Sequence, residues 1–599
     1  MRAGGGLRIR DMDVGTQVQH YSRKGFAWAR WLRQRVRASE FFFILIAIAI
    51  GMGAGLMTVA QGILAWAIQH ILYGIPNAVR LSGAPPLTLW QLAVLPLGGI
   101  VLAFFTWGVH ARRRALIDVV EANALHGGRM GVIDSLIVSG QTIISNGFGA
   151  SVGLEAAYAQ MGGVLASRAG RWLSLRRGDV RTLVGAGAGA AIAAAFGAPL
   201  AGAFYAFEIV IGAYTPAAIA PVAAASLAGA QVAQRLGAVP YIVVVNPGPA
   251  IHTAGYLIYA GLGLACALIG IGMMRAVAAV EGVTRAWLPH WSRPFVGGCL
   301  LVPVAMISPQ VLSAGHSALH IDMLDTVPFD FLIMILGAKI LASVLCLGFG
   351  FRGGLFFASL FLGTLAGHLY SLAGLWLFGH PVLDAGNAAM VGMAALATAV
   401  VGGPITMAML VLGATGNFSL TGAVLAASLV SSTIVRELFG YSFSTWRLHL
   451  RGETIKSARD VGWVKTLTAG RMMRGEVKTA PKDTTVSEFR RRFPLGSASR
   501  VALVDGEGHY AGIVTPATVF AEGVAGDAPV EKFAHSADAA LRPDMHIGEV
   551  MTRFDAAESD ELVILDGERR ILGILTETYV RRRYADELEK AHRELFGES

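Results

Sequence analysis

The chain has few charged residues and very few cysteines. Only 15% of its 599 residues are charged, against about 25% in ordinary soluble domains. Cys266, Cys299 and Cys346 are the three cysteines, all in apolar segments, and we interpret them as buried small hydrophobes. Their spacing fits neither a disulfide framework nor a metal site, and no cofactor motif is present. Residues 1–38 are basic and polar and lack the short apolar core of a signal peptide. This composition excludes a secreted disulfide-rich protein and disfavours an ordinary soluble enzyme.

Apolar residues dominate instead. They make up 54% of the chain, and the mean hydropathy is +0.56. From about Glu40 to Ser442 the sequence consists of apolar runs rich in glycine and alanine, whereas from about Arg447 onward it is charged. This change of composition predicts a large membrane domain, over 39–452, followed by a linker and a soluble domain.

The positive charge is concentrated beside apolar segments. The net charge is +9, which could suggest a nucleic-acid partner. However, nine Lys/Arg precede Phe41, and others lie in Arg112–Arg114 and Arg168–Arg181. Cytoplasmic loops of membrane proteins have this pattern. We therefore predict a multi-pass protein of the plasma (inner) membrane that binds no nucleic acid. The N-terminal segment 1–38 and the soluble domain are expected in the cytoplasm.

Many of the apolar segments are short. Phe41–Leu72 and Leu89–Trp107 are long enough to span about 30 Å of hydrocarbon at about 1.5 Å per residue. The shorter, glycine-broken segments are Gly131–Ile144, Val152–Ala166, Gly185–Phe196 and Pro199–Ile211. Broken helices persist at membrane depth only where protein or a watery cavity satisfies their backbone groups. The pattern indicates a transporter or channel whose site lies where helix ends meet.

Two motifs recur in the same order in both halves of the membrane domain. Gly149–Glu155 (GASVGLE) matches Gly350–Phe356 (GFRGGLF), and Gly197–Leu200 (GAPL) matches Gly402–Ile405 (GGPI). Small-residue runs precede the second motif in both halves. Closely packed Gly/Ala helices can resemble one another by chance, but the shared order favours inverted repeats around one site.

The segment Gly149–Glu155 predicts an anion site. Its glycines free the backbone, and the helix expected from about Gly153 has unpaired N–H groups and a positive dipole end. Such a helix start binds anions without a basic side chain. Glu155 would occupy that site when ionised and leave it when protonated, and would thus act as a gate. Alternatively, Glu155 is a helix-start residue satisfied by local amides.

At these residues the chain resembles the CLC chloride channel and transporter family. Gly153-Leu154-Glu155-Ala156-Ala157 is similar to the family signature Gly-Arg/Lys-Glu-Gly-Pro, and Gly354-Leu355-Phe356-Phe357-Ala358 to Gly-x-Phe-x-Pro. Ala198–Gly202 and Glu208 also fit a family helix. The resemblance covers about residues 40 to 452.

The resemblance has several implications. It implies an all-α polytopic membrane domain of inverted repeats, with about 17–18 helices, many of them short and broken. It also implies a homodimer with one pore per subunit, which transports small monovalent anions, chloride by default, across the lipid bilayer. Glu155 takes the place of the family's gating residue. The implied pore residues are Gly153, Leu154, Ala156, Gly354, Leu355, Phe356 and Phe357.

Two pore positions depart from the family. Arg114, followed by Ala115, takes the place of a pore-lining Ser, and Ser444 that of a pore Tyr. A guanidinium has forked donors that suit carboxylate-like anions, so bicarbonate is an alternative to chloride. Alternatively, Arg114 belongs only to a water-facing basic cluster.

A further departure concerns proton coupling. The internal Glu of family exchangers matches Ile209, which cannot carry a proton. Glu208 precedes it and is expected to be a structural carboxylate at a helix end, although a small rotation could bring it onto a proton route. We predict passive, channel-like anion flow, with proton-coupled exchange as the alternative.

The soluble part resembles a tandem pair of CBS domains. Ala511–Thr515 and Leu572–Thr576 each follow an alternating strand pattern, which predicts two α/β halves at about 468–523 and 543–588. The segment 453–467 is then the linker, and 589–599 the tail. Thr518 and Tyr579 occupy the positions at which nucleotide-binding members have an acidic residue, so we predict a structural or dimerising role without adenine nucleotide. Tyr584–Leu595 is expected to form a charged amphipathic helix.

Two other function classes are less compatible with these motifs. A membrane hydrolase needs a Ser/His or paired-Asp arrangement. His252, His316 and His320 have no Gly-x-Ser-x-Gly elbow or Asp pair to face them, so we predict that the chain is not an enzyme. A membrane sensor with a dead pore is the other class, and the retained Glu155 argues against it.

Overall fold

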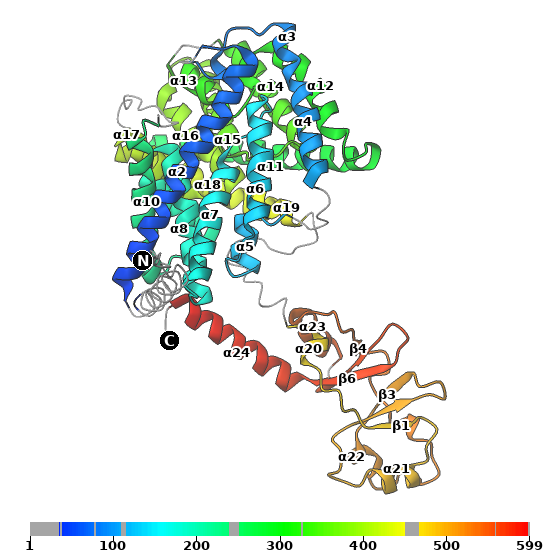
Figure 1. Ribbon diagram of the computed structural model, residues 1–599. Coiled ribbons are helices and arrows are strands. Elements are labelled where there is room, and N and C mark those ends of the chain that lie inside the picture. The colour runs from blue at the N-terminus through cyan, green and yellow to red at the C-terminus, as the bar shows by residue number, and fades with distance from the viewer. Residues whose placement is uncertain are drawn as a thin grey trace, which may run out of the picture. The chain divides into compact units, whose positions relative to one another are not determined.

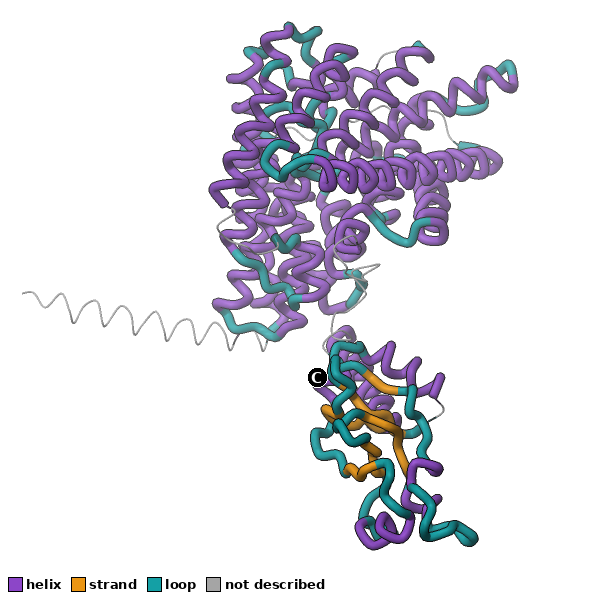
Figure 2. The backbone as a smooth tube through the Cα atoms, turned by 90° about the vertical axis from the view of Figure 1, so that its right-hand side faces the viewer, coloured by secondary structure: helices purple, strands orange, loops and turns teal. Residues whose placement is uncertain are grey.

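The structure is a computed structural model that describes Arg35 and residues 39–76, 79–109, 116–238, 251–324, 328–449, 467–557 and 559–596. These residues belong to two compact units, Met1–Asp460 and Val461–Ser599. In the described residues the first unit is helical, and strands occur only in the second (Figure 2). The predicted combination of a helical polytopic domain and a small α/β domain is confirmed.

The first unit contains many helices of unequal length (Figure 1). In chain order they are α2 (Glu40–Tyr73), α3 (Leu89–Leu92), α4 (Val94–Val109), α5 (Val119–Leu125), α6 (Val132–Gly147), α7 (Glu155–Trp172), α8 (Arg177–Phe196), α9 (Pro199–Tyr205), α10 (Pro216–Arg235), α11 (Thr253–Trp287), α12 (Arg293–Ile307), α13 (His316–Leu324), α14 (Phe329–Gly348), α15 (Phe356–Phe378), α16 (Ala385–Val401), α17 (Pro404–Thr415), α18 (Phe418–Leu438) and α19 (Phe443–His449). A π-helical segment, η2 (Ala206–Ile211), continues α9, and the 3-10 turns η1 (Leu81–Gly83) and η3 (Pro309–Val311) lie in loops.

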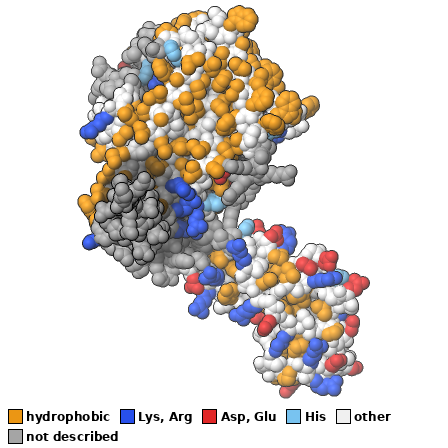
Figure 3. Space-filling view, in the orientation of Figure 1, with side chains coloured by type: hydrophobic (Ala, Val, Ile, Leu, Met, Phe, Trp, Pro, Cys, Tyr) orange, Lys and Arg blue, Asp and Glu red, His pale blue; other side chains and the backbone are white. Residues whose placement is uncertain are grey.

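Eight helices or helical stretches in the described residues are long and apolar enough to cross a membrane. Apolar side chains cover much of the visible face of this unit (Figure 3). The spans include α8, of 20 residues, although its apolar part suggested a short helix. Its first turn is charged and was not recognised as helical, because hydropathy alone marks only the lipid-depth portion of a helix.

The cysteines differ in burial. Cys266 and Cys346 are buried, as expected, but Cys299 is exposed. The expectation of three buried thiols was therefore wrong for Cys299. It lies on α12, and in a membrane protein an apolar helix turns one face toward lipid instead of the protein core.

The two halves of the first unit repeat the same helix packing. α7 lies against α8, and α15 against α16 (Figure 1). A Cβ atom added to Gly162 would lie 2.2 Å from the carbonyl oxygen of Gly187, and one added to Gly363 would lie 2.3 Å from that of Gly392. Only glycine allows these close backbone approaches. Gly187 and Gly392, which begin the small-residue runs of the two halves, are therefore contact points of equivalent helix pairs.

The second repeated motif also has one conformation in both halves. α8 ends at Gly197 with φ of +66°, and α16 ends at Gly402 with φ of +92°. The next residues, Ala198 and Gly403, have φ of −122° and −119°, and each is followed by a proline that starts a new helix. This glycine stop and proline start follow the ordinary rules for helix ends. The predicted internal repeat is present in the backbone.

The second unit consists of two similar α/β halves. Its elements are α20 (Ala469–Met472), β1 (Thr479–Pro481), α21 (Val486–Arg492), β2 (Val501–Val504), β3 (Tyr510–Val514), α22 (Pro516–Val519), η5 (Val530–Phe533), β4 (Ala540–Leu541), α23 (Ile547–Ala557), β5 (Glu561–Leu565), β6 (Ile571–Thr576) and α24 (Glu577–Phe596). The sheets have the orders β1-β2-β3 and β4-β5-β6. In each sheet the first pair of strands is parallel and the second pair antiparallel.

The two sheets share an apolar cluster that includes Ala502, Ile513 and Val563. The halves therefore pack as a pair. The strands expected before Ala511–Thr515 and Leu572–Thr576 are present as β2 and β5. The last helix is longer than predicted, because α24 begins at Glu577, directly after β6.

Candidate functional site

The loops before α7 and α15 meet each other. Gly153 N–H donates to Gly354 O at 2.8 Å, and Gly354 N–H donates to Gly153 O at 3.1 Å, which forms an antiparallel bridge. Each loop begins with a left-handed glycine, Gly149 (φ +89°) and Gly350 (φ +92°). The loops thus run in opposite directions, and the helix N-termini that follow them lie beside one point.

Buried polar contacts hold both loops. Asn146 Nδ2 donates to Val152 O at 2.7 Å. Ser151 N–H donates to Cys346 Sγ at 3.2 Å, and Arg352 N–H donates to Ser145 Oγ at 3.0 Å. Each loop is therefore anchored to the helix that leads into the other one, and this couples the two halves of the repeat.

Glu155 is the first residue of α7 and is 3% exposed. A Cβ atom on Gly153 would lie 2.0 Å from Glu155 Oε2, and one on Gly354 would lie 3.3 Å from it. The carboxylate is therefore folded back over the glycine bridge. The backbone amides of Glu155 and Phe357 interact with it electrostatically, but neither oxygen has a donor in hydrogen-bond geometry within the described residues. A buried carboxylate in this state is exceptional, because buried polar groups are normally paired.

A cavity of about 120 Å³ adjoins this carboxylate. Since a water molecule needs only about 10–15 Å³ of such space, the cavity has room for a small hydrated ion. Six of the residues predicted to form the site line it: Glu155, Ala156, Gly354, Leu355, Phe356 and Ser444. They come from α7, from α15 with the loop before it, and from α19, three segments far apart in the sequence.

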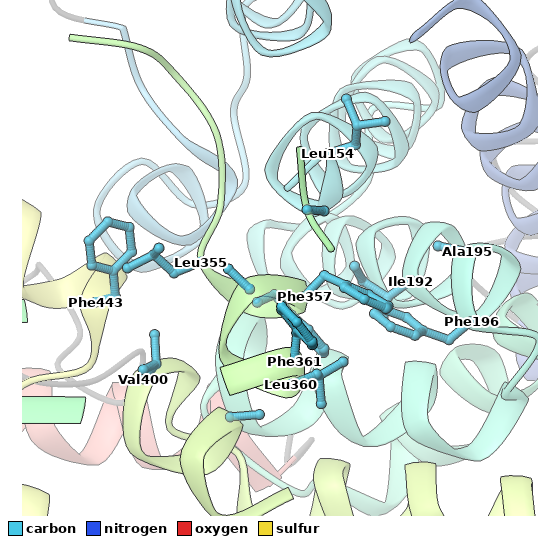
Figure 4. Close-up of a cluster of buried hydrophobic side chains, with 14 of the residues drawn as sticks. Leu154, Ile192, Ala195, Phe196, Leu355, Phe357, Leu360, Phe361, Val400 and Phe443 are labelled. Carbon is cyan, nitrogen blue, oxygen red and sulfur yellow. The ribbon is translucent and has the colours of Figure 1, made fainter. Parts of the chain in front are cut away.

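Other predicted site residues lie elsewhere. Leu154 points to a different cavity, beside Gln69 and His316. Phe357 is fully buried, and its ring lies 4.0 Å from that of His316, so only its backbone faces the site. Figure 4 shows Leu154 apart from Leu355, and Phe357 lower in the view, beside Phe361. Gly153 contributes only its backbone. Arg114 and Ala115 lie outside the described residues.

Glu208 lies in a second cavity, of about 560 Å³. Its carboxylate accepts hydrogen bonds from Ile405 N (3.1 Å), Thr406 N (2.8 Å) and Thr406 Oγ1 (2.6 Å), at the start of α17. This is the geometry of a carboxylate at a helix N-terminus. Ile209 and Ser444 line both this cavity and the cavity of Glu155. An apolar side chain therefore forms part of the wall between Glu208 and Glu155.

Sequence reasoning missed five polar residues that line the cavity of Glu155: Asp118, Gln160, Tyr205, Arg352 and Arg447. Asp118 precedes α5 and accepts a hydrogen bond from Glu121 N–H at 2.8 Å. Arg352 lay within a recognised motif, and its charge next to glycines was a usable signal. The sequence gives no signal that would single out Tyr205 or Arg447, because each is one of several similar residues in its segment.

A family model described as "Voltage gated chloride channel" matches residues 98–436, more than half of the chain. This chain belongs to the CLC chloride channel and transporter family. A second model, for the CBS domain, matches residues 469–523. The resemblance seen in the motifs is thereby confirmed, and the chain is a multi-pass membrane protein that carries out CLC-type anion transport.

Curated CLC relatives match over almost their whole length. The "Voltage-gated ClC-type chloride channel ClcB" of Salmonella dublin is 28% identical over 404 residues, which is 66% of this chain and 96% of the relative. A "Putative chloride channel protein ClcB-like" of Ralstonia nicotianae is 26% identical over 394 residues, or 64% and 92% of the two chains.

Solved structures share the CLC fold. A slow cyanobacterial Cl⁻/H⁺ antiporter superposes with a TM-score of 0.58 at 22% identity, over 68% of this chain and 97% of its own. A eukaryotic CLC transporter superposes with a TM-score of 0.59 at 17% identity and covers 90% of this chain and 97% of its own. The latter match extends beyond the membrane domain.

Proposed function

We propose that the membrane domain conducts small monovalent anions, chloride by default, through the cavity beside Glu155, and that Glu155 is the gate. The observation that carries this proposal is the Gly153–Gly354 bridge. It brings two helix N-termini to one cavity, where a buried carboxylate that accepts no hydrogen bond from the described residues lies over the bridge. Helix starts of this kind favour anions through their free N–H groups and dipoles.

The gate works by competition in this proposal. An ionised Glu155 carboxylate occupies the place that faces the amide of Phe357 and blocks the anion. A protonated carboxyl group has lost the charge that favours this place, so an anion displaces it. Flux through the protein should therefore rise as the pH falls.

Removal of the carboxylate tests the gate. Glu155→Gln protein, reconstituted in liposomes, should release chloride faster than wild type and with a flatter dependence on pH, because the charged competitor is gone. Glu437→Gln, an exposed carboxylate at the end of α18, is the matched control and should behave as wild type. Equal rates and equal pH profiles for Glu155→Gln and wild type would show that Glu155 is not the gate.

We further propose that this flow is not coupled to protons. Ile209, Val120 and Val401 are apolar residues that line both cavities, and three hydrogen bonds hold Glu208 at the start of α17. Ser444 is the one polar side chain among the described residues that line both cavities, and it does not ionise, so no described carboxylate bridges Glu208 and Glu155. A wall that is mostly apolar resists proton passage. A pH-sensitive dye in chloride-loaded liposomes measures the coupling, and chloride efflux without proton movement is expected.

Proton-coupled exchange is the second candidate. It is favoured by fold neighbours that are described as a Cl⁻/H⁺ antiporter and a fluoride/proton antiporter. Uphill proton movement driven by a chloride gradient would establish it. Loss of that movement in Glu208→Gln would then identify Glu208 as the inner proton carrier.

We also propose a homodimer in the plasma (inner) membrane, with one pore per subunit. Segment 1–38, the linker 453–467, the CBS pair at 468–588 and the tail 589–599 would lie in the cytoplasm. Basic residues gather where α7 ends and α8 begins, namely Arg171, Arg176 and Arg177, and they support this orientation through the positive-inside rule. The CBS pair would serve dimerisation without a nucleotide. Light scattering of the purified protein should give twice the chain mass, and a monomer would contradict the assembly.

A further inference from the structure

The cavity of Glu155 has a wall of unusual polarity. In the described residues its charged side chains are Arg352, Arg447, Asp118 and Glu155. Figure 4 shows Leu355, Val400 and Phe443, which line the same cavity, gathered on one side. Against this apolar background, the polar side chains of the described lining are two guanidinium groups, two carboxylates, the hydroxyls of Tyr205 and Ser444 and the amide of Gln160. The Gln160 amide already donates to Ile117 O at 3.0 Å and to Ser135 Oγ at 3.1 Å.

Tyr205 supplies a buried hydroxyl group. Its residue is 8% exposed, and its ring packs 6.1 Å from that of Phe356. The hydroxyl makes no hydrogen bond within the described residues, but it interacts electrostatically with Asp118 and Glu155, which line the same cavity. Buried tyrosine hydroxyls normally find a partner. A molecule in the cavity is the partner available to this one.

Arg352 and Arg447 mark the junction of two cavities. They are the two residues that line both the Glu155 cavity and a neighbouring cavity of about 290 Å³. Arg352 is held through its backbone N–H, which donates to Ser145 Oγ at 3.0 Å. Arg447 lies in α19 with its Cζ 5.8 Å from the centre of the Phe443 ring. An ion that passes between these cavities moves past both guanidinium groups.

The neighbouring cavity is itself positively charged. Besides Arg352 and Arg447 it is lined by Arg285, Arg293 and His290. Its one carboxylate, Glu281, forms an ion pair with Arg285 at 2.5 Å. Among the described residues the arginines outnumber this carboxylate, and a net positive charge in a cavity raises the local concentration of anions. It would supply anions to the junction.

The charges around Glu155 set the valence of the ion. Among the described residues of the cavity wall, two guanidinium groups and, with Glu155 ionised, two carboxylates carry charge. When the Glu155 carboxyl group is protonated or withdraws, one negative charge leaves this wall. A monovalent anion restores the balance, whereas a divalent anion exceeds it, and burying unbalanced charge is costly.

We infer that Tyr205, Arg352 and Arg447 form the anion-binding donor set of this chain, and that this set admits planar monovalent oxyanions, such as bicarbonate and nitrate, alongside chloride. The inference rests on the proposed transport through the Glu155 cavity. A guanidinium group presents parallel N–H donors that match two oxygens of one plane, and the phenol hydroxyl adds a third donor. A spherical chloride ion cannot use this fork in the same way.

Competition for chloride uptake tests the inference. The full-length protein is reconstituted in liposomes, and radioactive chloride uptake is measured against unlabelled chloride, nitrate or bicarbonate. In wild type the two oxyanions should inhibit at concentrations no higher than unlabelled chloride does. Arg352→Lys keeps the charge but loses the fork. This variant should raise the nitrate and bicarbonate concentrations needed to inhibit uptake by at least about tenfold, because a charge-assisted hydrogen bond is lost. The concentration of unlabelled chloride needed for inhibition should change much less.

Further variants separate the donors. Arg447→Gln should also weaken oxyanion competition more than chloride competition, and Tyr205→Phe should weaken both because it removes a neutral donor. Arg235→Gln is the control, since Arg235 is exposed at the end of α10 and lines none of the three cavities. It should match wild type.

The failing outcomes are distinct. If neither wild type nor Glu155→Gln takes up chloride above empty liposomes, both the proposed transport and this inference fall. If uptake is robust but nitrate and bicarbonate do not compete in wild type, only the donor set is refuted. Equal shifts for all anions in Arg352→Lys would likewise refute it, because the fork would then not distinguish ion shapes.

Discussion

Gly153→Ala tests the resting position of the Glu155 carboxylate with a single methyl group. The added Cβ would lie 2.0 Å from Oε2, whereas ordinary contacts begin at 3.4 Å. Oε2 must therefore move away by about 1.4 Å, the difference between these distances. Gly153 does not have a positive φ, so alanine fits its backbone. The strain falls on the flexible end of the glutamate side chain.

The size of the effect follows from that displacement. Forcing a side chain about 30° off its rotamer costs about 0.5–1.5 kcal/mol. If this cost falls on the blocking position alone, the ratio of open to blocked gates rises by about 2- to 12-fold. Gly153→Ala should therefore increase chloride flux by about fivefold at a pH where Glu155 blocks. The carboxylate is still present, so the dependence on pH should persist, in contrast to Glu155→Gln.

Chloride efflux from liposomes between about pH 4 and pH 8 measures both quantities. Gly272→Ala, on α11, is the matched control because an added Cβ there has no atom within 4 Å. The reasoning is refuted if Gly153→Ala elutes as wild type in gel filtration but transports at the wild-type rate throughout this range. A lower flux in a folded variant would also refute it, since it would mean that the methyl group narrows the path.

Three other outcomes are expected. Glu208→Gln should leave chloride flux near wild type but lower the free energy of unfolding by about 0.3–1 kcal/mol, because a charge at the start of α17 is lost; a large change in flux would instead place Glu208 on the ion path. Gly363→Ala should lower the melting temperature in detergent, because its Cβ would lie 2.3 Å from Gly392 O and overpacking costs about 1–3 kcal/mol. The control Gly374→Ala, which has open space around it, should not lower it. Raising the ionic strength should weaken chloride uptake at limiting chloride if the basic cavity of Arg285 and Arg293 attracts anions, and an unchanged rate would show that it does not.

Much of the backbone could be predicted because glycine and proline have strong local rules. The stop at Gly197 and the start at Pro199 follow from those rules, as do their counterparts Gly402 and Pro404. The internal repeat of Gly149–Glu155 and Gly350–Phe356 also predicted that the loops of Glu155 and Gly354 meet. The long, uniformly apolar spans could be predicted from the number of consecutive apolar residues alone.

Side-chain direction was less predictable. Leu154 and Glu155 are neighbours, but they line different cavities. The reason is that α7 begins at Glu155 and not at Gly153, and successive residues at a helix start point about 100° apart. A motif places a residue in the sequence, but one step along a helix start changes the cavity that its side chain reaches.

The sequence alone determined that this chain is a membrane protein with an internal repeat, a carboxylate at a glycine-exposed helix start and a paired α/β domain. These properties depend on hydropathy, local backbone preference and motif order, which neighbouring residues carry by themselves. Only the tertiary structure decided which polar groups surround Glu155. Tyr205, Arg352 and Arg447 come from three distant segments, and they share a cavity because helix packing brings those segments together. Local sequence patterns do not encode that proximity.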